Sequence, residues 1–230
     1  MKSHQRIIRE NKAKTDSLDN LFGSWWEGLD LDISTAECKE ISLRTAAGII
    51  KEYEYLGTMP NAPLRSYGIY FDGACGGAVI YGAISPPSVA RSVCPDYSDK
   101  VIQLSRGACV HWAHPHSASK LISYSLHEIK KLGWKIVVAY ADPDAGEIGT
   151  VYQATNWFFC GVTAKRPDYL LPNGKRFMGH MKKGEAALLK KTARTRKGRY
   201  VYVLGSRKEK RMIMKSLKWP IENYPKRMYN

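Results

Sequence analysis

The sequence lacks any apolar run of about 18 residues, the length that a transmembrane helix requires. Its first 20 residues are polar and mixed in charge, so they also lack the apolar stretch of a secretory signal peptide. Cysteines are few, five in 230 residues, and none form a CxxC pair. These absences predict a cytoplasmic protein with reduced, mostly buried thiols, no membrane contact and no zinc site built on cysteine.

Acidic residues are scarce near the C-terminus. Residues 161–230 hold 20 Lys and Arg against four Asp and Glu, whereas residues 1–160 hold 16 basic and 17 acidic residues. Such an asymmetry is typical of proteins that bind nucleic acid through phosphate contacts, although a solvated basic surface without a partner is the alternative. The densest run of predicted DNA-binding residues comprises Lys182, Lys183, Lys190, Lys191, Arg194, Arg196 and Lys197.

Periodicity and turn residues predict an α/β fold with a mixed sheet. Residues 1–20 are expected to form a loosely ordered arm, and a capping-box pattern at Ser34 and Glu37 predicts a helix to about Tyr53. Further helices are expected at 118–132 and 208–217. Strands are expected at 67–71, 78–84, 100–110, 136–140 and 200–204.

The most informative segment is residues 135–161. A β-branched strand ends here at a turn rich in Asp, Pro and Gly, and a short helix and a second strand follow. Asp142 is therefore expected at the carboxyl end of a strand and Tyr152 about one turn into the next helix. Since ligands of α/β sheets bind at such strand ends, both side chains could face one substrate. The alternative is that Asp142 caps the helix and Tyr152 packs in the core.

The predicted order of elements resembles the GNAT fold of acyltransferases, with a basic C-terminal extension. In that fold the acyl carrier's pyrophosphate binds at the start of the helix after the fourth strand. The chain lacks the usual Arg/Gln-x-x-Gly-x-Gly signature there. It has instead Ser117, Ala118, Ser119 and Lys120, which could hold a phosphate at a helix N-terminus.

Several ordered motifs resemble the Mom family of bacteriophage DNA-modification proteins, over about residues 49–226. They are YLGTMP (55–60), LSRGACV (104–110), SASK (117–120), YADP (140–143), GTVYQATNW (149–157), NGK (173–175), RYV (199–201) and YPK (224–226). The resemblance implies a phage-encoded enzyme of the host cytoplasm. It would convert adenine in DNA to N6-carbamoylmethyladenine, which protects the phage genome from host restriction.

By the same resemblance, the catalytic residues are Arg106, Asp142, Tyr152 and Tyr55. Arg106 would stabilise carbonyl or phosphate charge, or would instead form a structural ion pair with Asp142. Two positions where the family often has His carry Glu54 and Glu147 in this chain, so a carboxylate would have to replace an imidazole there.

Adenine N6 is a poor nucleophile, because its lone pair is delocalised into the ring. The enzyme must therefore flip the base out of double-stranded DNA and can stack it on an aromatic side chain. Asp142 would accept a proton or hydrogen bond from the amine, and Tyr152 would donate to a leaving group. The aromatic candidates are Trp25, Trp26, Tyr53, Tyr55 and Trp157.

The product that the resemblance implies is an isomer of N6-glycyladenine, so glycyl transfer followed by rearrangement would reach it. Glycyl-tRNA would suit the basic surface and would make tRNA a second partner, while acetyl-CoA with later amination is the alternative donor.

An H-x-x-H-x-H cluster of His111, His114 and His116 is a candidate iron site, although such loop histidines are more often solvated. The sequence does not choose between a monomer and a homodimer.

We expect three regions: an N-terminal arm (1–33), a GNAT-like catalytic core (34–165) and a basic DNA-binding part packed on the core (166–230). Two other classes of function remain open at this stage. Fold alone favours an N-acyltransferase that acts on a protein or a small molecule, and charge alone favours a DNA-binding protein without catalysis.

Overall fold

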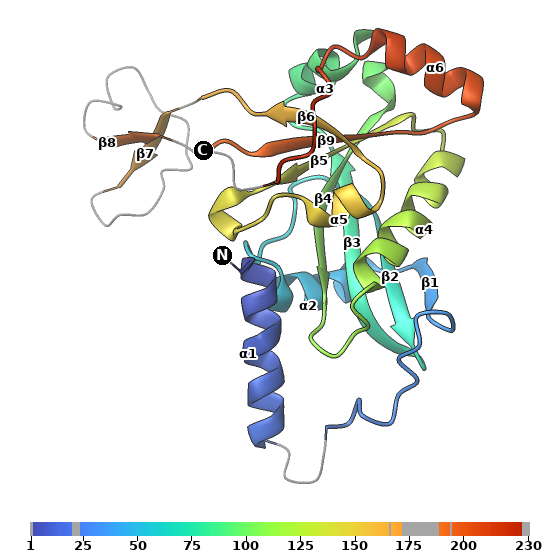
Figure 1. Cartoon of the computed structure of the whole chain (residues 1–230), viewed down its shortest axis with the longest axis vertical. Helices are drawn as coiled ribbons and strands as arrows, with labels where there is room; N and C mark the ends of the chain where they lie inside the picture. The colour runs from blue at the N-terminus through green and yellow to red at the C-terminus, as the bar shows by residue number, and fades with distance from the viewer. Residues whose placement is uncertain (1, 20–23, 166, 172–188, 194, 227–230) are drawn as a thin grey trace.

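A computed structural model describes residues 2–19, 24–165, 167–171, 189–193 and 195–226 (Figure 1). The helices are α1 (His4–Asp19), α2 (Leu43–Tyr53), α3 (Pro87–Val93), α4 (Ser117–Lys131), α5 (Thr150–Ala154) and α6 (Arg207–Ser216), with 3-10 turns η1 (Pro95–Lys100) and η2 (Pro143–Ala145). The strands are β1 (Glu37–Glu40), β2 (Pro63–Phe71), β3 (Ala74–Ala83), β4 (Val101–Cys109), β5 (Ile136–Ala141), β6 (Phe158–Val162), β7 (Pro167–Leu170), β8 (Lys190–Ala193) and β9 (Gly198–Val203).

Seven strands form one mixed sheet in the order β1-β2-β3-β4-β5-β9-β6, and β7 pairs with β8 in a separate hairpin. The pairs β1–β2, β2–β3 and β3–β4 are antiparallel, whereas β4 and β5 run parallel. The predicted α/β fold class, a mixed central sheet flanked by helices, is confirmed. The sheet contains the predicted hairpin, formed by β2 and β3, and the predicted helix at 118–132 corresponds to α4, which connects β4 to β5.

The parallel pairing of β4 with β5 is short, so the two strands separate over most of the length of β4. Only Val101–Gln103 of β4 pair with Ile136–Val138 of β5, and the strands then diverge. The rest of β4 pairs with β3 alone, which leaves its other edge open toward the carboxyl end of β5. Open α/β sheets bind ligands at such ends, so the divergence predicts a site between these strands.

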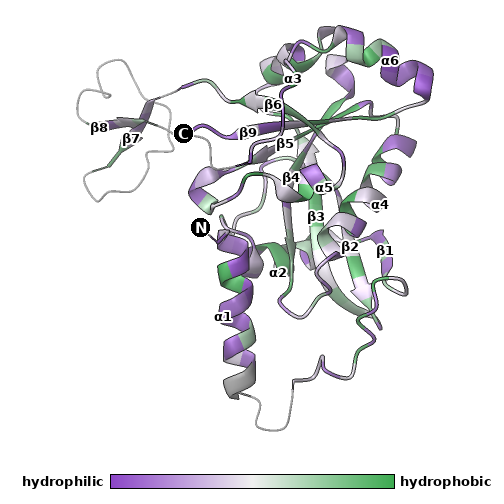
Figure 2. Ribbon diagram, in the orientation of Figure 1, coloured by the Kyte–Doolittle hydropathy of each residue, from purple (hydrophilic) through white to green (hydrophobic). Residues whose placement is uncertain are grey.

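Two apolar clusters hold the sheet. The larger one packs α2 and α4 against β2, β3 and β4, with Ile50 and Leu121 fully buried. The smaller one joins α3 and α6 to β5, β6 and β9, with Ile213 of α6 fully buried. Because Ile136, Val137 and Val138 have no exposed surface, β5 is covered on both faces, as its β-branched run predicts. Figure 2 shows the apolar β3 inside and the mostly hydrophilic α1 and α6 outside.

The basic C-terminal part contributes a central strand of the sheet. Strand β9 lies between β5 and β6 and is antiparallel to both, and Tyr200 and Val201 on it are fully buried. Chain beyond residue 166 therefore completes the core. The β7–β8 hairpin lies away from the sheet (Figure 1).

Two sequence predictions were wrong. Residues 4–19 form helix α1 instead of a loose arm. The capping box at Ser34 and Glu37 does not form, because the Ser34 hydroxyl donates to the Asp32 carboxylate at 2.7 Å and Glu37 begins β1. The helix begins later, at Leu43, where the Ser42 hydroxyl accepts from the backbone of Thr45 at 3.0 Å. Cross-strand pairing outweighed the local capping signal.

None of the helices in the described ranges is both long and apolar enough to cross a membrane.

Candidate active site

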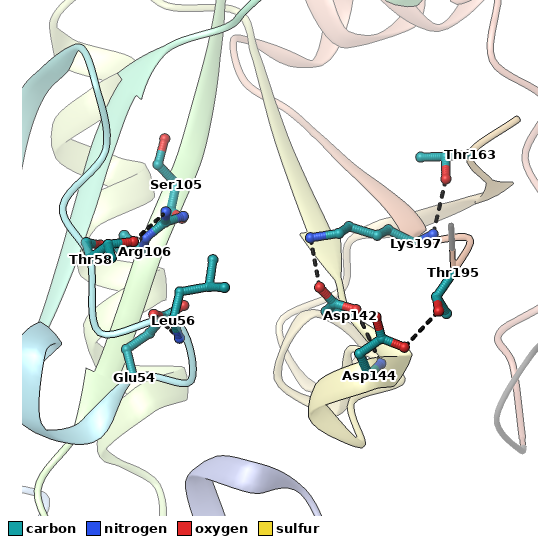
Figure 3. Close-up of polar contacts among 10 residues, drawn as sticks. All are labelled: Glu54, Leu56, Thr58, Ser105, Arg106, Asp142, Asp144, Thr163, Thr195 and Lys197. Atoms are coloured by element: carbon teal, nitrogen blue, oxygen red, sulfur yellow. Dashed lines mark hydrogen bonds and ion pairs between the residues drawn. The ribbon is translucent and has the colours of Figure 1, made fainter. Parts of the chain in front are cut away.

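A cleft of about 470 Å³ opens where β4 and β5 diverge. All four residues predicted to be catalytic line it: Tyr55 after α2, Arg106 on β4, Asp142 at the end of β5 and Tyr152 on α5. Figure 3 shows the two walls that face each other across it, with Arg106 on one and Asp142 on the other. Residues separated by up to 97 positions in sequence therefore meet at one site.

Asp142 is held by an ion pair on one wall of the cleft. Its Oδ2 lies 2.6 Å from Nζ of Lys197, and its Oδ1 accepts from the backbone of Asp144 at 3.1 Å. The hydroxyl of Thr163 accepts from the backbone of Lys197 at 3.0 Å, and Thr195 donates to Asp144 at 2.6 Å (Figure 3). Asp142 caps the η2 turn, as one sequence alternative proposed, and also faces the cleft.

Arg106 forms the opposite wall and does not pair with Asp142. Its Nε donates to the carbonyl of Thr58 at 2.8 Å and its Nη1 to the carbonyl of Ser105 at 2.7 Å. The structural alternative of an Arg106–Asp142 ion pair is therefore not formed. Both acceptors are uncharged carbonyl oxygens, and they hold the guanidinium in place on this wall of the cleft.

Two further carboxyl groups lie in the cleft. Glu54 follows α2, and its Oε2 accepts from the backbones of Leu56 at 2.8 Å and Gly57 at 3.2 Å. Burial raises the pKa of Glu54, although these two amides oppose the shift. Burial also raises the pKa of Glu147 to about 7, and the negative charges of Glu54 and Asp142 add to that shift. Glu147 thus changes charge near neutral pH.

Tyr152 lines the cleft and lies against two aromatic rings. Its ring centroid lies 5.1 Å from those of Trp157 and Tyr200. Burial raises its pKa further above the usual range, and the nearby Glu147 carboxylate adds to the effect. The hydroxyl therefore stays protonated and can act as a hydrogen-bond or proton donor. Gly149 begins this helix with φ +78°, and a Cβ there would overlap the ring of Tyr200.

A second cavity of about 260 Å³ adjoins the cleft. It lies between the open edge of β4, the start of α4 and α5, and α1 covers part of it. Five residues line both cavities, so the two spaces meet around them. These shared residues are Gln5, Leu104, Gly107, Glu147 and Tyr152.

Of the four predicted donor-binding residues, Ala118 lines this second cavity. The other three are bonded within the protein. The hydroxyl of Ser117 donates to the carbonyl of His114 at 2.7 Å, that of Ser119 donates to the carbonyl of His116 at 2.9 Å, and the ammonium of Lys120 donates to the carbonyl of Ile33. A donor phosphate at the start of α4 would have to replace these bonds.

The predicted aromatic platform needs correction. Of the five candidates, Tyr55 alone lines the cleft. Trp157 is fully buried in the core and Tyr53 is bonded to His111 at 2.9 Å, because their positions face the packed interior. Trp25 and Trp26 lie against Trp112 and His111. Two aromatics that sequence reasoning missed, Tyr140 and Trp219, line the cleft together with Arg199.

The predicted iron site is not supported. His111 is 5% exposed and bonds to the Tyr53 hydroxyl on one side and the Asp16 carboxylate, at 2.8 Å, on the other. His114 and His116 lie together with ring centroids 5.3 Å apart. Among the described residues, no group of three or more His, Cys, Asp or Glu side chains could hold a metal ion.

The predicted DNA-binding run lies partly within the described residues. Lys190 and Lys191 are exposed on β8, Arg196 donates to the carbonyl of Thr163 at 2.8 Å, and Lys197 lies in the cleft. Lys182, Lys183 and Arg194, like the NGK motif, lie outside the described residues.

The chain is similar to several solved structures of acetyltransferases. An IAA acetyltransferase from Bacillus cereus matches with 11% identity, a TM-score of 0.42, and 74% of this chain and 100% of that chain covered. The ribosomal-protein-S18-alanine N-acetyltransferase from Escherichia coli matches with 9% identity, a TM-score of 0.43, and 75% and 96% covered. An acetyltransferase from Bacillus subtilis in complex with CoA matches with 10% identity, a TM-score of 0.43, and 74% and 98% covered.

At these identities the likeness concerns the fold alone. No curated protein sequence matches the chain. The profile of the Mom protein family, in contrast, matches residues 35–226, which hold every residue of the cleft except Gln5. The chain therefore belongs to the Mom protein family.

Proposed function

We propose that the protein modifies adenine N6 in double-stranded DNA by transfer of an activated acyl group, and that the final product is N6-carbamoylmethyladenine. The observation that supports this most is the convergence of Tyr55, Arg106, Asp142 and Tyr152 on one cleft in a chain of the Mom family. The phage setting and protection from host restriction are part of the same proposal.

The cleft suits a flipped base in size and chemistry. Its volume of about 470 Å³ falls in the range of small-molecule sites. Tyr55 and Tyr140 supply rings against which a base can stack, which offsets the few kcal/mol that extrusion costs. The contact with Lys197 fixes the orientation of Asp142, whose carboxyl oxygens can accept a hydrogen bond from N6.

The two cavities suit two reactants. The base would enter the larger cleft, and the activated acyl group would reach Tyr152 through the smaller cavity. The Tyr152 hydroxyl would donate to the leaving group, and Arg106 would stabilise negative charge on the donor. A glycyl donor such as glycyl-tRNA supplies every atom of the product, because glycyl and carbamoylmethyl are isomers and a rearrangement on N6 completes the change. Acetyl-CoA, the alternative donor, supplies the two carbons and would need a later amination with a two-electron oxidant.

Mass spectrometry of nucleosides from the DNA of expressing cells tests the proposal. The expected result is a deoxyadenosine adduct that gains the mass of a carbamoylmethyl group. A Tyr152→Phe variant serves as the inactive control, because it loses the hydroxyl and keeps the ring packing.

The two alternatives give different outcomes. Unmodified DNA together with acylated protein or small-molecule amines would identify a general N-acyltransferase. Unmodified DNA with tight DNA binding and no acylated product would identify a non-enzymatic DNA-binding protein. Either result would overturn the proposal.

A further inference from the structure

Glu147 occupies the junction between the two cavities. It is one of five residues that line both, and among those five it is the only one with an ionisable carboxyl group. Tyr152 is the other shared residue with an exchangeable proton suited to acid–base chemistry. An acid–base pair therefore stands where the contents of the two cavities would meet.

Asp142 is less suited to take a proton than its position suggests. Its Oδ2 lies 2.6 Å from the ammonium of Lys197 and its Oδ1 accepts a backbone N–H of the η2 turn. Both oxygens of this carboxyl group therefore already have a donor within the protein, and these contacts fix its orientation. Glu54 lines the larger cavity but not the smaller one, and its Oε2 is held by two backbone amides.

From this geometry we infer that Glu147 is the general base that takes the proton from adenine N6, while Asp142 orients the amine. The inference rests on the proposed function and names the residue that carries its proton transfer.

The N6 lone pair attacks the acyl carbon, an N–C bond forms, and the bond from that carbon to the leaving oxygen or sulfur breaks. Glu147 accepts the proton that N6 loses, and the Tyr152 hydroxyl donates a proton to the leaving atom. Glu147 then returns its proton to the Tyr152 oxygen, so both side chains regain their starting state.

The charged groups around Glu147 set the pKa of its carboxyl group. Glu54, after α2, and Asp142, at the end of β5, raise its pKa through their negative charges. Lys197, before β9, opposes them. Arg106 of β4 and Arg9 of α1 line the two cavities on either side. The resulting pKa of about 7 matches a base that works at neutral pH.

The test compares Glu147→Gln and Glu147→Asp with the wild type, by adduct yield in the DNA of expressing cells. Glu147→Gln keeps the size and loses the base, and we expect a roughly 100-fold or greater loss of adduct. Glu147→Asp keeps a carboxyl group and should restore a measurable part of the yield. Matching far-UV circular dichroism and melting curves at about pH 5 would show that both variants fold.

A pH profile separates proton transfer from a structural role. Purified full-length protein would modify added DNA in an extract of non-expressing cells, which supplies the donor. The wild-type rate should rise with pH through about 7. Glu54→Gln removes a charge that raises the pKa of Glu147, so the rise should move to lower pH when each profile is normalised to its own maximal rate.

The outcomes distinguish this inference from the proposed function. If the wild type produces no adduct, the proposed function fails. If the wild type produces it and folded Glu147→Gln does too, the inference fails and the function stands. A pH profile that Glu54→Gln leaves in place would also overturn the inference.

Discussion

At the scale of single residues, Asp142 and Lys197 link the two halves of the sequence. The carboxylate ends β5 and the ammonium precedes β9, so their 2.6 Å contact ties two neighbouring strands together beside the cleft. Both side chains are partly buried, at 16% and 27% exposure, which makes this contact stronger than a surface ion pair.

Removing the Asp142 carboxyl group or the Tyr152 hydroxyl should abolish most activity while the protein stays folded. We predict that Asp142→Ala and Tyr152→Phe stay folded and bind DNA, and that modification falls by a factor of about 100 or more. Asp142→Ala also leaves Lys197 without its partner, so stability should drop by about 1 to 2 kcal/mol. Nucleoside mass spectrometry and thermal melting measure the two effects. Normal adduct yield in both variants would refute the catalytic assignment.

Glu147 should lower the stability of the fold at alkaline pH. Its pKa is about 7 in the folded protein against 4.5 for the free side chain, so the unfolded chain releases this proton first as pH rises. The stability contribution of the protonated group is present below about pH 4.5 and is lost as pH rises to about 7. Glu147→Gln should therefore be more stable by about 1 to 2 kcal/mol at pH ~8 and nearly unchanged at pH ~4.5.

Thermal melting of both proteins at the two pH values measures this effect. Glu128→Gln is a suitable control, because Glu128 bonds to Lys131 on the outer side of α4, away from the cleft. Equal melting temperatures for wild type and Glu147→Gln at pH ~8 would contradict the predicted burial of the charge.

At the scale of elements, α5 depends on the glycine that begins it. Gly149 has a positive φ and lies against the ring of Tyr200, so Gly149→Ala combines backbone strain with an overlap. We expect a loss of roughly 2 to 4 kcal/mol and displacement of Tyr152 from the cleft. Gly48→Ala is the matched control. Gly48 lies in α2 with nothing near its Cβ position, and Ala there should stabilise the helix by up to about 1 kcal/mol.

Urea denaturation of the two alanine variants measures both changes. If Gly149→Ala unfolds at the same urea concentration as the wild type, the start of α5 is not constrained as this structure indicates.

Helix α1 is attached to the body mainly by polar contacts. Gln5 donates to the carbonyl of Gly107 at 2.9 Å, and Arg9 donates to two carbonyls of the loop after β4. Ile8 is its partly buried apolar contact with the core. Such an element opens with a smaller free energy than the whole protein, because few apolar contacts hold it.

We predict that Arg9→Ala speeds hydrogen exchange of the α1 amides roughly tenfold, since it removes hydrogen bonds worth about 1 to 2 kcal/mol. Exchange in β5 should stay as in the wild type. Lys14→Ala, at an exposed position of the same helix, is the control and should leave exchange within about twofold. Unchanged exchange in Arg9→Ala would show that other contacts hold α1.

At the scale of the whole molecule, two basic surfaces are candidates for the proposed contact with DNA. Lys190 and Lys191 are exposed on β8, and Lys208, Arg211 and Lys215 are exposed on α6. None of these three α6 side chains forms an ion pair within the described part of the chain. Each phosphate contact adds about 0.9 to the logarithmic salt slope on duplex DNA, so titrations can count them.

We predict that neutralising Lys190, Lys191, Arg194 and Arg196 together weakens binding to all DNA sequences alike and flattens the salt slope. Target preference should persist, because phosphate contacts position a protein and base contacts specify. A matching triple variant of Lys208, Arg211 and Lys215 is the comparison. Wild-type affinity and slope in the first set, with losses in the second, would place the DNA contact on α6.

The sequence by itself determined much of this protein. The hairpin, the strand at 136–140 and the helix at 118–132 follow from local alternation, β-branched runs and turn residues, which act within a few positions. Family motifs indicated Arg106, Asp142, Tyr152 and Tyr55, and these four line one cleft.

Tertiary structure alone decided the rest. Residues 37–40 form a strand because they pair with β2, although the local sequence predicts a helix there. Helix α1 is positioned by hydrogen bonds to the loop after β4. Asp142 meets Lys197 because β9 pairs with β5. Glu147 lies between two cavities because β4 diverges from β5. Contacts between distant segments depend on the free energy of the whole packing, which local periodicity does not contain.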